Sequence, residues 1–179
     1  MFKSNFTLFF VAALFLLTSA CTSEKSKTSS NQMMEKKMAE MKKAPDFEVM
    51  TIDGQTVSLQ KAMKANKPMV VYFTASWCPV CAKNWPELSK VYPEYKDKLT
   101  FVAIGIDPTD TEEVMRKLSM EKGFTFPVTA GHPQIMLDFG VETQATTVGI
   151  NRKGYIAFQK NKTTLSADEF RSLFDELIN

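Results

Sequence analysis

Two cysteines three residues apart, placed where a strand gives way to a helix, constrain this chain more than any other feature. The apolar run 69–73 is continuous, as expected for a buried central strand. Pro79, directly after Cys78, suits the first turn of a helix, where its missing N–H costs nothing. Cys81 follows one helical turn later and can form a disulfide with Cys78. The sequence therefore predicts a strand, a loop and a helix whose N-terminus carries an exposed Cys78.

This placement has a chemical consequence. The N-terminus of a helix favours an anion, because its first N–H groups are unpaired and the helix dipole is positive there. The thiolate is the nucleophile in disulfide exchange, so the position predicts a Cys78 that reacts near neutral pH. Cys81, on the protected side, is placed to resolve the mixed disulfide that Cys78 forms. The pair is therefore interpreted as a catalytic, redox-active disulfide.

Three other interpretations fit the cysteine pair less well. A structural disulfide more often joins distant segments, and across this spacing it restrains little chain. A zinc site needs about four ligands, and the remaining candidates are Cys21 and His132, far apart in the sequence. Two unreactive buried thiols leave the preceding Trp77 and the strand-to-helix junction unexplained. No metal site and no cofactor are expected, and His132 is interpreted as a surface residue at a helix start.

The length of 179 residues suits one domain with accessory segments. The formal net charge of +2 argues against a dedicated nucleic-acid binder, whose folded part would carry a basic excess. Beyond Ala44 strands alternate with helices. The expected strands are 47–52, 55–59, 69–73, 99–106, 126–129, 146–150 and 155–159, and the expected helices are 78–95, 110–122, 132–139 and one starting at Ser166. This order predicts an α/β fold with a mixed central sheet, helices on both faces and an N-terminal β-hairpin.

The first twenty residues have the layout of an export signal. Lys3 precedes an apolar run over 6–17, which is too short to cross a membrane, and small residues precede Cys21. This arrangement resembles a bacterial lipoprotein signal, in which the cysteine is lipidated and becomes the mature N-terminus. An ordinary secretory signal with a chance cysteine is the alternative. The expected division is a signal peptide over 1–20, a tether over 21–44 and one domain over 45–179.

The tether contains a segment that favours a helix. Residues 32–43 combine good helix formers with Met34, Met38 and Met41, which share one helical face. A short amphipathic helix is therefore predicted. Methionine thioethers also suit Cu(I) in an exported protein, so copper binding is a second interpretation of this segment.

From about Pro45 onward the chain resembles the thioredoxin-fold, membrane-tethered thiol–disulfide oxidoreductases of the TlpA/ResA group. Pro86 falls where thioredoxins kink the active-site helix, and the stretch 110–130 corresponds to the extra helix and strand that this group adds to thioredoxin. The other matching segments are 75–81, 124–128, 139–141, 146–147 and 151–154.

The resemblance implies an α/β thioredoxin fold and a dithiol that reduces disulfides in extracytoplasmic proteins. It also implies electrons from a membrane thiol donor of the DsbD/CcdA kind. The protein would be lipid-anchored outside the cytoplasmic membrane of a bacterium, facing the periplasm in a Gram-negative host. Substrate contact is expected from residues around the dithiol and the loop opposite it, namely Trp77, Pro79, Gln144 and Ala145.

Three departures from the group's pattern lie near the cysteines. The group has a cis-proline where this chain has Ala145, and because a cis bond before alanine costs about 3–4 kcal/mol, the Gln144–Ala145 bond is expected to be trans. Tyr72 replaces thioredoxin's buried carboxylate, and Asn84 replaces an acid that many relatives carry. The helix turns Glu87 away from that position, so the second cysteine lacks an obvious general base. Slow turnover or a narrow substrate range is expected.

Three rival classes remain as alternatives. A peroxiredoxin would have Thr or Ser three residues before its reactive cysteine, where this chain has Ala75. The segment 106–111 resembles a loop of Sco-like copper chaperones, but those proteins use a CxxxC spacing and a histidine where this chain has Thr143. A lipid-anchored binding module with an inert disulfide is consistent with the missing carboxylates.

Overall fold

The computed structural model describes residues 40–179, which are built around a five-stranded sheet with the strand order β5-β4-β3-β6-β7. The signal predicted over 1–20, Cys21 and most of the tether lie outside the described residues. The strands of this sheet are β3 (Met69–Thr74), β4 (Thr100–Gly105), β5 (Val128–Gly131), β6 (Thr146–Ile150) and β7 (Ile156–Lys160). Because β3 is parallel to β4 and antiparallel to β6, the sheet is mixed, as predicted.

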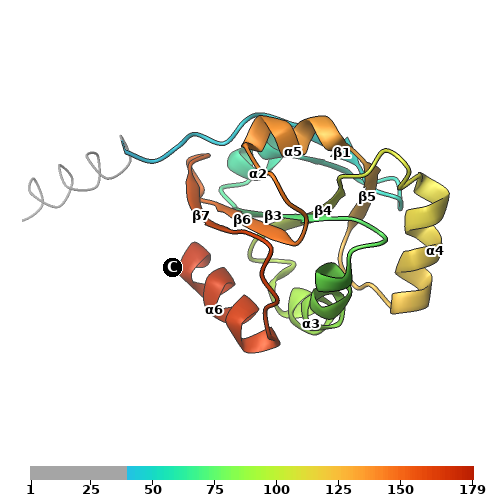
Figure 1. Ribbon diagram of the computed structural model, residues 1–179. Helices are drawn as coiled ribbons and strands as arrows, with labels where there is room; N and C mark the ends of the chain where they lie inside the picture. Colours follow the sequence, from blue (N-terminus) through green and yellow to red (C-terminus); the bar gives the residue numbers. More distant parts are fainter. Residues whose placement is uncertain (1–39) are drawn as a thin grey trace, which may run out of the picture. The chain divides into compact units, whose positions relative to one another are not determined.

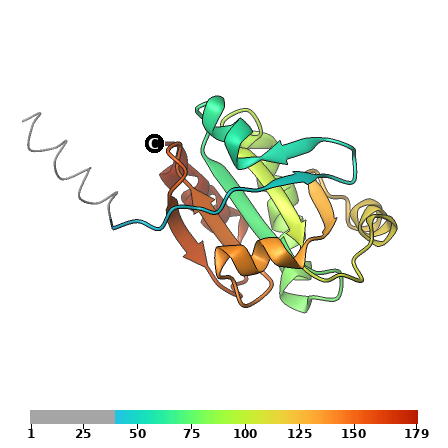
Figure 2. The same ribbon diagram turned by 90° about the horizontal axis from the view of Figure 1, so that it is seen from above.

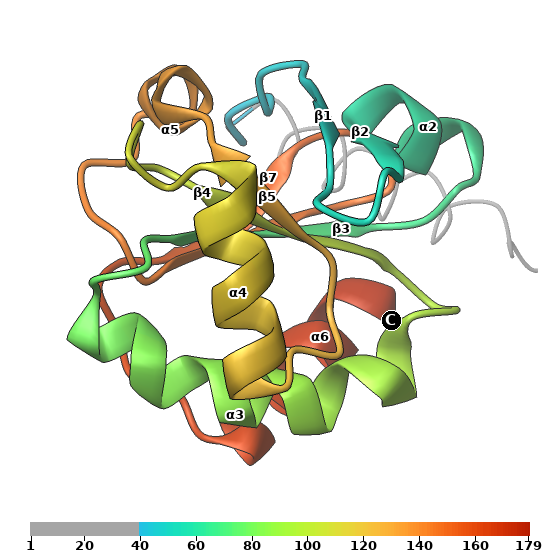
Figure 3. The same ribbon diagram turned by 90° about the vertical axis from the view of Figure 1, so that its right-hand side faces the viewer.

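The helices and a two-stranded hairpin complete the fold. The hairpin consists of β1 (Glu48–Met50) and β2 (Thr56–Ser58), and the helices are α2 (Leu59–Lys64), α3 (Pro79–Tyr95), α4 (Glu112–Lys122), α5 (Pro133–Phe139) and α6 (Ala167–Ile178). Figures 1 and 3 show α2, α5 and the hairpin over one face of the sheet and α3 and α6 over the other. Helices therefore cover both faces, which confirms the predicted arrangement of layers.

The side chains of β3 alternate between two hydrophobic cores. Val70 and Tyr72 pack in the core that α3 and α6 close, together with Trp85, Phe170 and Phe174. Met69, Val71 and Phe73 pack in the core beneath α2 and α5. All six residues of β3 are buried, because successive side chains of a strand point to opposite faces and both faces are covered. The apolar run therefore forms the predicted central strand.

Most helix ends follow the sequence signals. Ser166 and Glu169 form the predicted capping box at α6, and Gly123 and Gly140 end α4 and α5 in the left-handed conformation. The long helix α3 continues past both internal prolines, Pro86 and Pro93. The short helix α2, which the hydrophobic pattern did not indicate, begins after Ser58, whose side chain accepts a hydrogen bond from the Lys61 N–H.

The predicted edge strand is present but shifted. It begins at Val128, next to β4 at the margin of the sheet, rather than at Phe126. Pro127 has no N–H to offer the ladder, although its carbonyl accepts a hydrogen bond from the N–H of Ala103.

The chain before the hairpin corrects the predicted end of the tether. A helix was expected up to Lys43, but residues 41–43 are not helical and Lys43 forms a β-bridge with Tyr155. The Ala44 N–H donates to the carbonyl of Gly154, and the Ile156 N–H donates to the carbonyl of Lys42, both at 2.9 Å. Figure 2 shows this segment passing the β6–β7 end of the sheet. The ordered fold therefore includes residues 42–44. Within the described part of the chain, no helix combines the length and hydrophobicity needed to cross a membrane.

Candidate active site

The two cysteines form a disulfide at the start of α3. Cys78 is the N-cap residue of the helix, and its Sγ accepts a hydrogen bond from the backbone N–H of Cys81 at 3.0 Å. The Cα atoms of the two residues are 5.2 Å apart. Cys78 follows the carboxyl end of β3 through a short loop, and Pro79 occupies the first helical turn, as predicted. The unpaired N–H groups of this turn are therefore available to stabilise a thiolate on Cys78 in the reduced form.

The predicted exposure of Cys78 is wrong for the disulfide form. Cys78 is 1% exposed and Cys81 is fully buried. Both belong to the buried core cluster that also contains Ala75 and Ala145. On the surface beside the pair lie Trp77, which is 57% exposed, and Pro79, which is also exposed.

The loop between β4 and α4 holds the segment that leads into Cys78. One carboxylate oxygen of Asp110 accepts a hydrogen bond from the Ser76 N–H at 3.0 Å. The indole N–H of Trp77 donates to Asp107 at 2.7 Å. Because β3 and β4 are parallel neighbours, their carboxyl ends and the loops that follow them lie side by side. The sequence indicated this loop only through its likeness to a loop of copper chaperones. The pair of aspartates directly after a buried parallel strand could have indicated that the loop lies beside the cysteines.

Asp107 is held as a carboxylate by its neighbours. Its other oxygen accepts hydrogen bonds from the Thr109 hydroxyl at 2.6 Å and the Thr109 N–H at 2.8 Å. These bonds, and then the one from Trp77, lower the pKa of Asp107 below its ordinary value. Asp107 is therefore ionised at neutral pH and orients the exposed indole beside the dithiol.

The positions of the two missing carboxylates form a satisfied polar pair. Asn84 is fully buried on α3, and its amide donates to the Tyr72 hydroxyl at 3.1 Å and to the Thr163 carbonyl at 2.8 Å. The amide oxygen accepts from the Leu165 N–H at 2.9 Å. Burial raises the pKa of Tyr72 well above its usual value, so its hydroxyl stays protonated. This pair ties α3 to the β7–α6 connection and supplies no base to Cys81.

Glu87 does not replace the two missing carboxylates. One of its carboxylate oxygens accepts a hydrogen bond from the Ala167 N–H at 3.1 Å, and the other pairs with Lys90 at 2.7 Å. The hydrogen bond from Lys90 is the main cause that lowers the pKa of Glu87. The side chain therefore serves the start of α6 rather than the cysteines.

The loop opposite the cysteines adopts a backbone conformation that the sequence did not suggest. The described residues contain no cis peptide bond, which confirms the expected trans bond before Ala145. Ala145 has φ of +56°, in the left-handed region that alanine rarely adopts. Its N–H donates to the Phe73 carbonyl at 2.8 Å, and its carbonyl accepts from the Thr163 N–H at 3.3 Å. Both backbone groups of Ala145 are thus used within the protein, and of the two residues assigned to substrate contact in this loop, only Gln144 keeps exposed surface.

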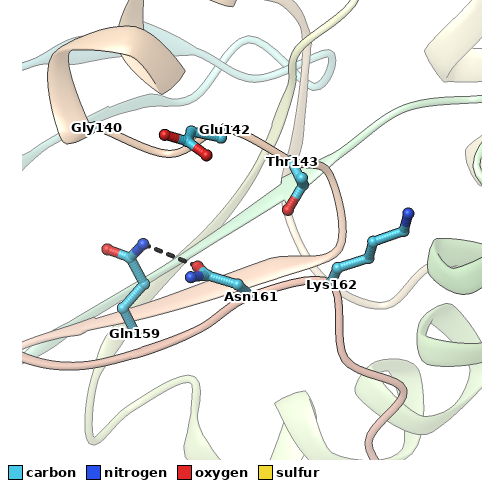
Figure 4. Close-up of a pocket in the computed structure, with 6 residues that line it drawn as sticks. All are labelled: Gly140, Glu142, Thr143, Gln159, Asn161 and Lys162. Atoms are coloured by element: carbon cyan, nitrogen blue, oxygen red, sulfur yellow. Dashed lines mark hydrogen bonds between the residues drawn. The ribbon is translucent and has the colours of Figure 1, made fainter.

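A polar surface pocket of about 390 Å³ lies beside this loop (Figure 4). It is formed by the segment that follows α5 and by the end of β7, and its lining residues are Gly140, Glu142, Thr143, Gln159, Asn161 and Lys162. Gln159 donates to the neighbouring Asn161 on one side of it at 2.8 Å. Because β6 starts directly after this loop and pairs with the end of β3, the pocket and the dithiol are at the same end of the sheet.

The residues that would support the rival chemistries have other partners. The hydroxyl of Thr74, one place from the peroxiredoxin position, accepts a hydrogen bond from the Trp85 indole at 3.0 Å. The hydroxyl of Thr146 donates to the Thr143 carbonyl at 2.8 Å. Over residues 40–179 there is no group of three or more histidines, cysteines or acids that could hold a metal ion. His132 is half-buried at the start of α5.

Comparison with known proteins agrees with this geometry. Residues 41–163 match the AhpC/TSA family. The thioredoxin-like protein YneN of Bacillus subtilis is 33% identical over 118 residues, which cover 65% of this chain and 68% of YneN. The thiol–disulfide oxidoreductase ResA of Bacillus thuringiensis is 31% identical over 124 residues, which cover 69% of this chain and 70% of ResA.

The fold is shared with solved structures as well. A thiol:disulfide interchange protein of the thioredoxin family from Chlorobium tepidum superimposes with a TM-score of 0.68 at 22% sequence identity, over 78% of this chain and 98% of that chain. This likeness confirms the thioredoxin fold, and the curated relatives support a thiol–disulfide oxidoreductase activity. The chain belongs to the AhpC/TSA family and is a thioredoxin-fold thiol–disulfide oxidoreductase similar to ResA.

Proposed function

We propose that this protein is an exported, lipid-anchored reductase of disulfides in extracytoplasmic proteins. The observation that carries the proposal is the Cys78–Cys81 pair at the N-terminus of α3, beside the exposed Trp77. Reduction is the direction implied by the likeness to ResA-type proteins, and the export signal predicted over 1–20, directly before Cys21, supports the location.

The reaction needs two exchanges between thiols and disulfides. The Cys78 thiolate attacks one sulfur of the substrate disulfide, forming a mixed disulfide and releasing the first substrate sulfur as a thiolate. The Cys81 thiolate then attacks Cys78, forming the Cys78–Cys81 disulfide and releasing the second. The substrate gains two electrons and two protons, and the enzyme loses them. A dithiol of a membrane donor of the DsbD/CcdA kind restores the enzyme by the reverse exchange.

The contact surface for the substrate consists of Trp77, Pro79 and Gln144. Trp77 and Pro79 present exposed apolar area next to Cys78, and Asp107 fixes the indole. Since both cysteines are buried in the disulfide form, the substrate gains access to Cys78 when the pair is reduced and the residues that cover it move. This requirement supports a narrow range of substrates.

The attachment point supports tethering. Residues 42–44 pair with residues 154–156, at the turn between β6 and β7. Met69 pairs with Ile150 and Phe73 with Thr146, so this turn is at the end of the sheet opposite the dithiol. At about 3.3 Å per residue, the two ends are roughly 15–20 Å apart. The chain therefore enters the domain at the end of the sheet opposite the dithiol.

Redox titration of the Cys78–Cys81 couple tests the direction. A midpoint potential near or below about −250 mV supports a reductase, and one near about −120 mV marks an oxidant and overturns the proposal. Cys81→Ser should accumulate mixed disulfides with extracytoplasmic proteins, because the resolving thiol is gone. Cys78→Ser is the matched control and should trap none.

Metabolic labelling tests the anchor. The wild-type protein, expressed in bacteria fed a labelled fatty acid, should carry the label and sediment with the membranes. Cys21→Ala should lose both properties. A wild-type protein that is exported but unlabelled would leave the ordinary secretory signal as the correct interpretation.

A further inference from the structure

A buried carboxylate stands behind the loop that carries Cys78. Asp110 is 1% exposed. One of its oxygens, Oδ2, accepts the hydrogen bond from the Ser76 N–H at 3.0 Å. The other, Oδ1, is buried without any hydrogen-bond partner. A carboxylate withdrawn from water with one oxygen unsatisfied is costly, because the charge is compensated by neither solvent nor a full set of donors.

The backbone around Asp110 fixes the carboxylate in place. The Asp110 N–H donates to the Asp107 carbonyl at 3.0 Å, and the Asp110 carbonyl accepts from the Gly131 N–H at 2.8 Å. Gly131 itself packs so closely that an added Cβ would lie 1.9 Å from the Asp107 carbonyl oxygen. These contacts hold the backbone of the loop against β5 and so fix the position from which the carboxylate reaches Ser76.

The charge is close to the reactive sulfur. Ser76 precedes Cys78 by two residues, a separation of at most about 7.6 Å between Cα atoms. The carboxylate accepts a hydrogen bond from the Ser76 N–H and thus lies within about 15 Å of the Cys78 sulfur. In a partly buried site the effective dielectric constant is about 20. Two negative charges at that distance then repel each other enough to shift the dithiol–disulfide equilibrium about tenfold.

We infer that Asp110 is a positioning residue that holds the Ser76–Cys78 loop and whose buried charge biases the Cys78–Cys81 couple toward the disulfide. The bias arises because the dithiol form carries the Cys78 thiolate, which the neighbouring carboxylate repels, while the disulfide carries no charge. A couple that favours its disulfide is a stronger reductant. This inference rests on the proposed function and deepens it. The thioredoxin carboxylate position holds Tyr72 and the relatives' acid position holds Asn84, so this chain takes its buried charge from a different element.

The test compares redox potentials of the full-length protein. Asp110→Asn keeps an oxygen that can accept from the Ser76 N–H but removes the charge. We expect its midpoint potential to lie about 30 mV above the wild-type value, which corresponds to a tenfold change in the equilibrium constant of a two-electron couple. The reduced variant should also be alkylated at Cys78 up to about tenfold faster at neutral pH, because more of the thiol is ionised.

Glu113→Gln is the matched control, because it removes the same charge from an exposed position at the start of α4 and should leave the potential unchanged. An Asp110→Asn protein with the wild-type potential overturns the inference. If that variant does not fold, Asp110→Ser replaces it, and a folded Ser variant with the wild-type potential has the same meaning. The absolute wild-type potential tests the reductive direction separately, so failure of that proposal is distinguishable from failure of this one.

Discussion

Ala145 shows how a single residue can change the wall of the active site without changing the fold. Its positive φ places the N–H against the Phe73 carbonyl, so the start of β6 is joined to the end of β3 just before the cysteine loop begins. A proline has no N–H and holds φ near −65°. The backbone conformation at Ala145 therefore differs from the one that the cis-proline of the group adopts.

Ala145→Pro should consequently destabilise the protein rather than restore the group's arrangement. We expect a loss of about 2–3 kcal/mol in the free energy of unfolding, from the lost hydrogen bond to Phe73 and the incompatible φ. Urea denaturation of the oxidised protein measures it. Ala145→Gly keeps the N–H and tolerates positive φ, so it should stay within about 1 kcal/mol of the wild type. A proline variant as stable as the wild type would contradict the loop conformation described above.

Asn84 gives a second prediction at the residue scale. Asn84→Asp, which reintroduces an acid at the relatives' position, should lower the free energy of unfolding at neutral pH by about 2–4 kcal/mol. The aspartate loses the donor that serves the Thr163 carbonyl and places a buried charge beside it. Chemical denaturation checks the loss, with Lys83→Gln, an exposed change on the same helix, expected within about 0.5 kcal/mol of the wild type. An unchanged stability of Asn84→Asp would show that the site tolerates the charge.

At the scale of elements, the sequence predicted those strands and helices that carry a long hydrophobic pattern or a clear capping signal. The run 69–73 and the capping box at Ser166 became β3 and the start of α6. The helix α2 was missed because its six residues are too few to show a period. The burial of Cys78 could not be predicted, since it comes from packing with residues that are distant in the sequence. The placement of Asp107 and Asp110 behind the cysteines could not be predicted either, because it depends on β3 and β4 being neighbours in the sheet.

The contact of β5 with the β4–α4 loop is an element-level feature that can be tested. Gly131→Ala should lower the free energy of unfolding by about 1–3 kcal/mol, because the new Cβ meets the Asp107 backbone and the two elements must separate. Disulfide reductase activity should fall as well, since this loop orients Trp77. Denaturation and an insulin-reduction assay measure the two effects. Met120→Ala, 78% exposed on α4, should change neither. Full activity and stability in Gly131→Ala would rule out the tight contact.

At the scale of the whole molecule, stability should depend on pH in two windows. Hydrogen bonds and ion pairs lower the pKa of the carboxyls of Glu87, Glu94, Asp107 and Glu169. A lowered folded-state pKa contributes stability above the unfolded-state pKa, near 4, and this stability disappears as the pH falls through the folded-state values. Burial, followed by the hydrogen bond to Asp175, raises the pKa of Tyr95 to about 12. A raised pKa contributes stability that is complete below the unfolded-state value of about 10 and disappears as the pH rises through 12.

Urea midpoints measured from pH 3 to pH 11 should therefore form a plateau between about 5 and 10 and decline on both sides. Tyr95→Phe removes the ionisable hydroxyl and should make the alkaline decline shallower while leaving the acid limb unchanged. An alkaline limb identical in the two proteins would mean that Tyr95 is not responsible.

The pairing of residues 42–44 with the β6–β7 turn also has a mechanical consequence. Any tension that reaches the domain from its N-terminal side is borne first by this short ladder and by β7 beyond it. The load enters at the β7 margin of the sheet, and β6 lies between this margin and β3, which positions Cys78. Strain on the leading segment should thus fray the margin before it disturbs the geometry of the sulfur pair.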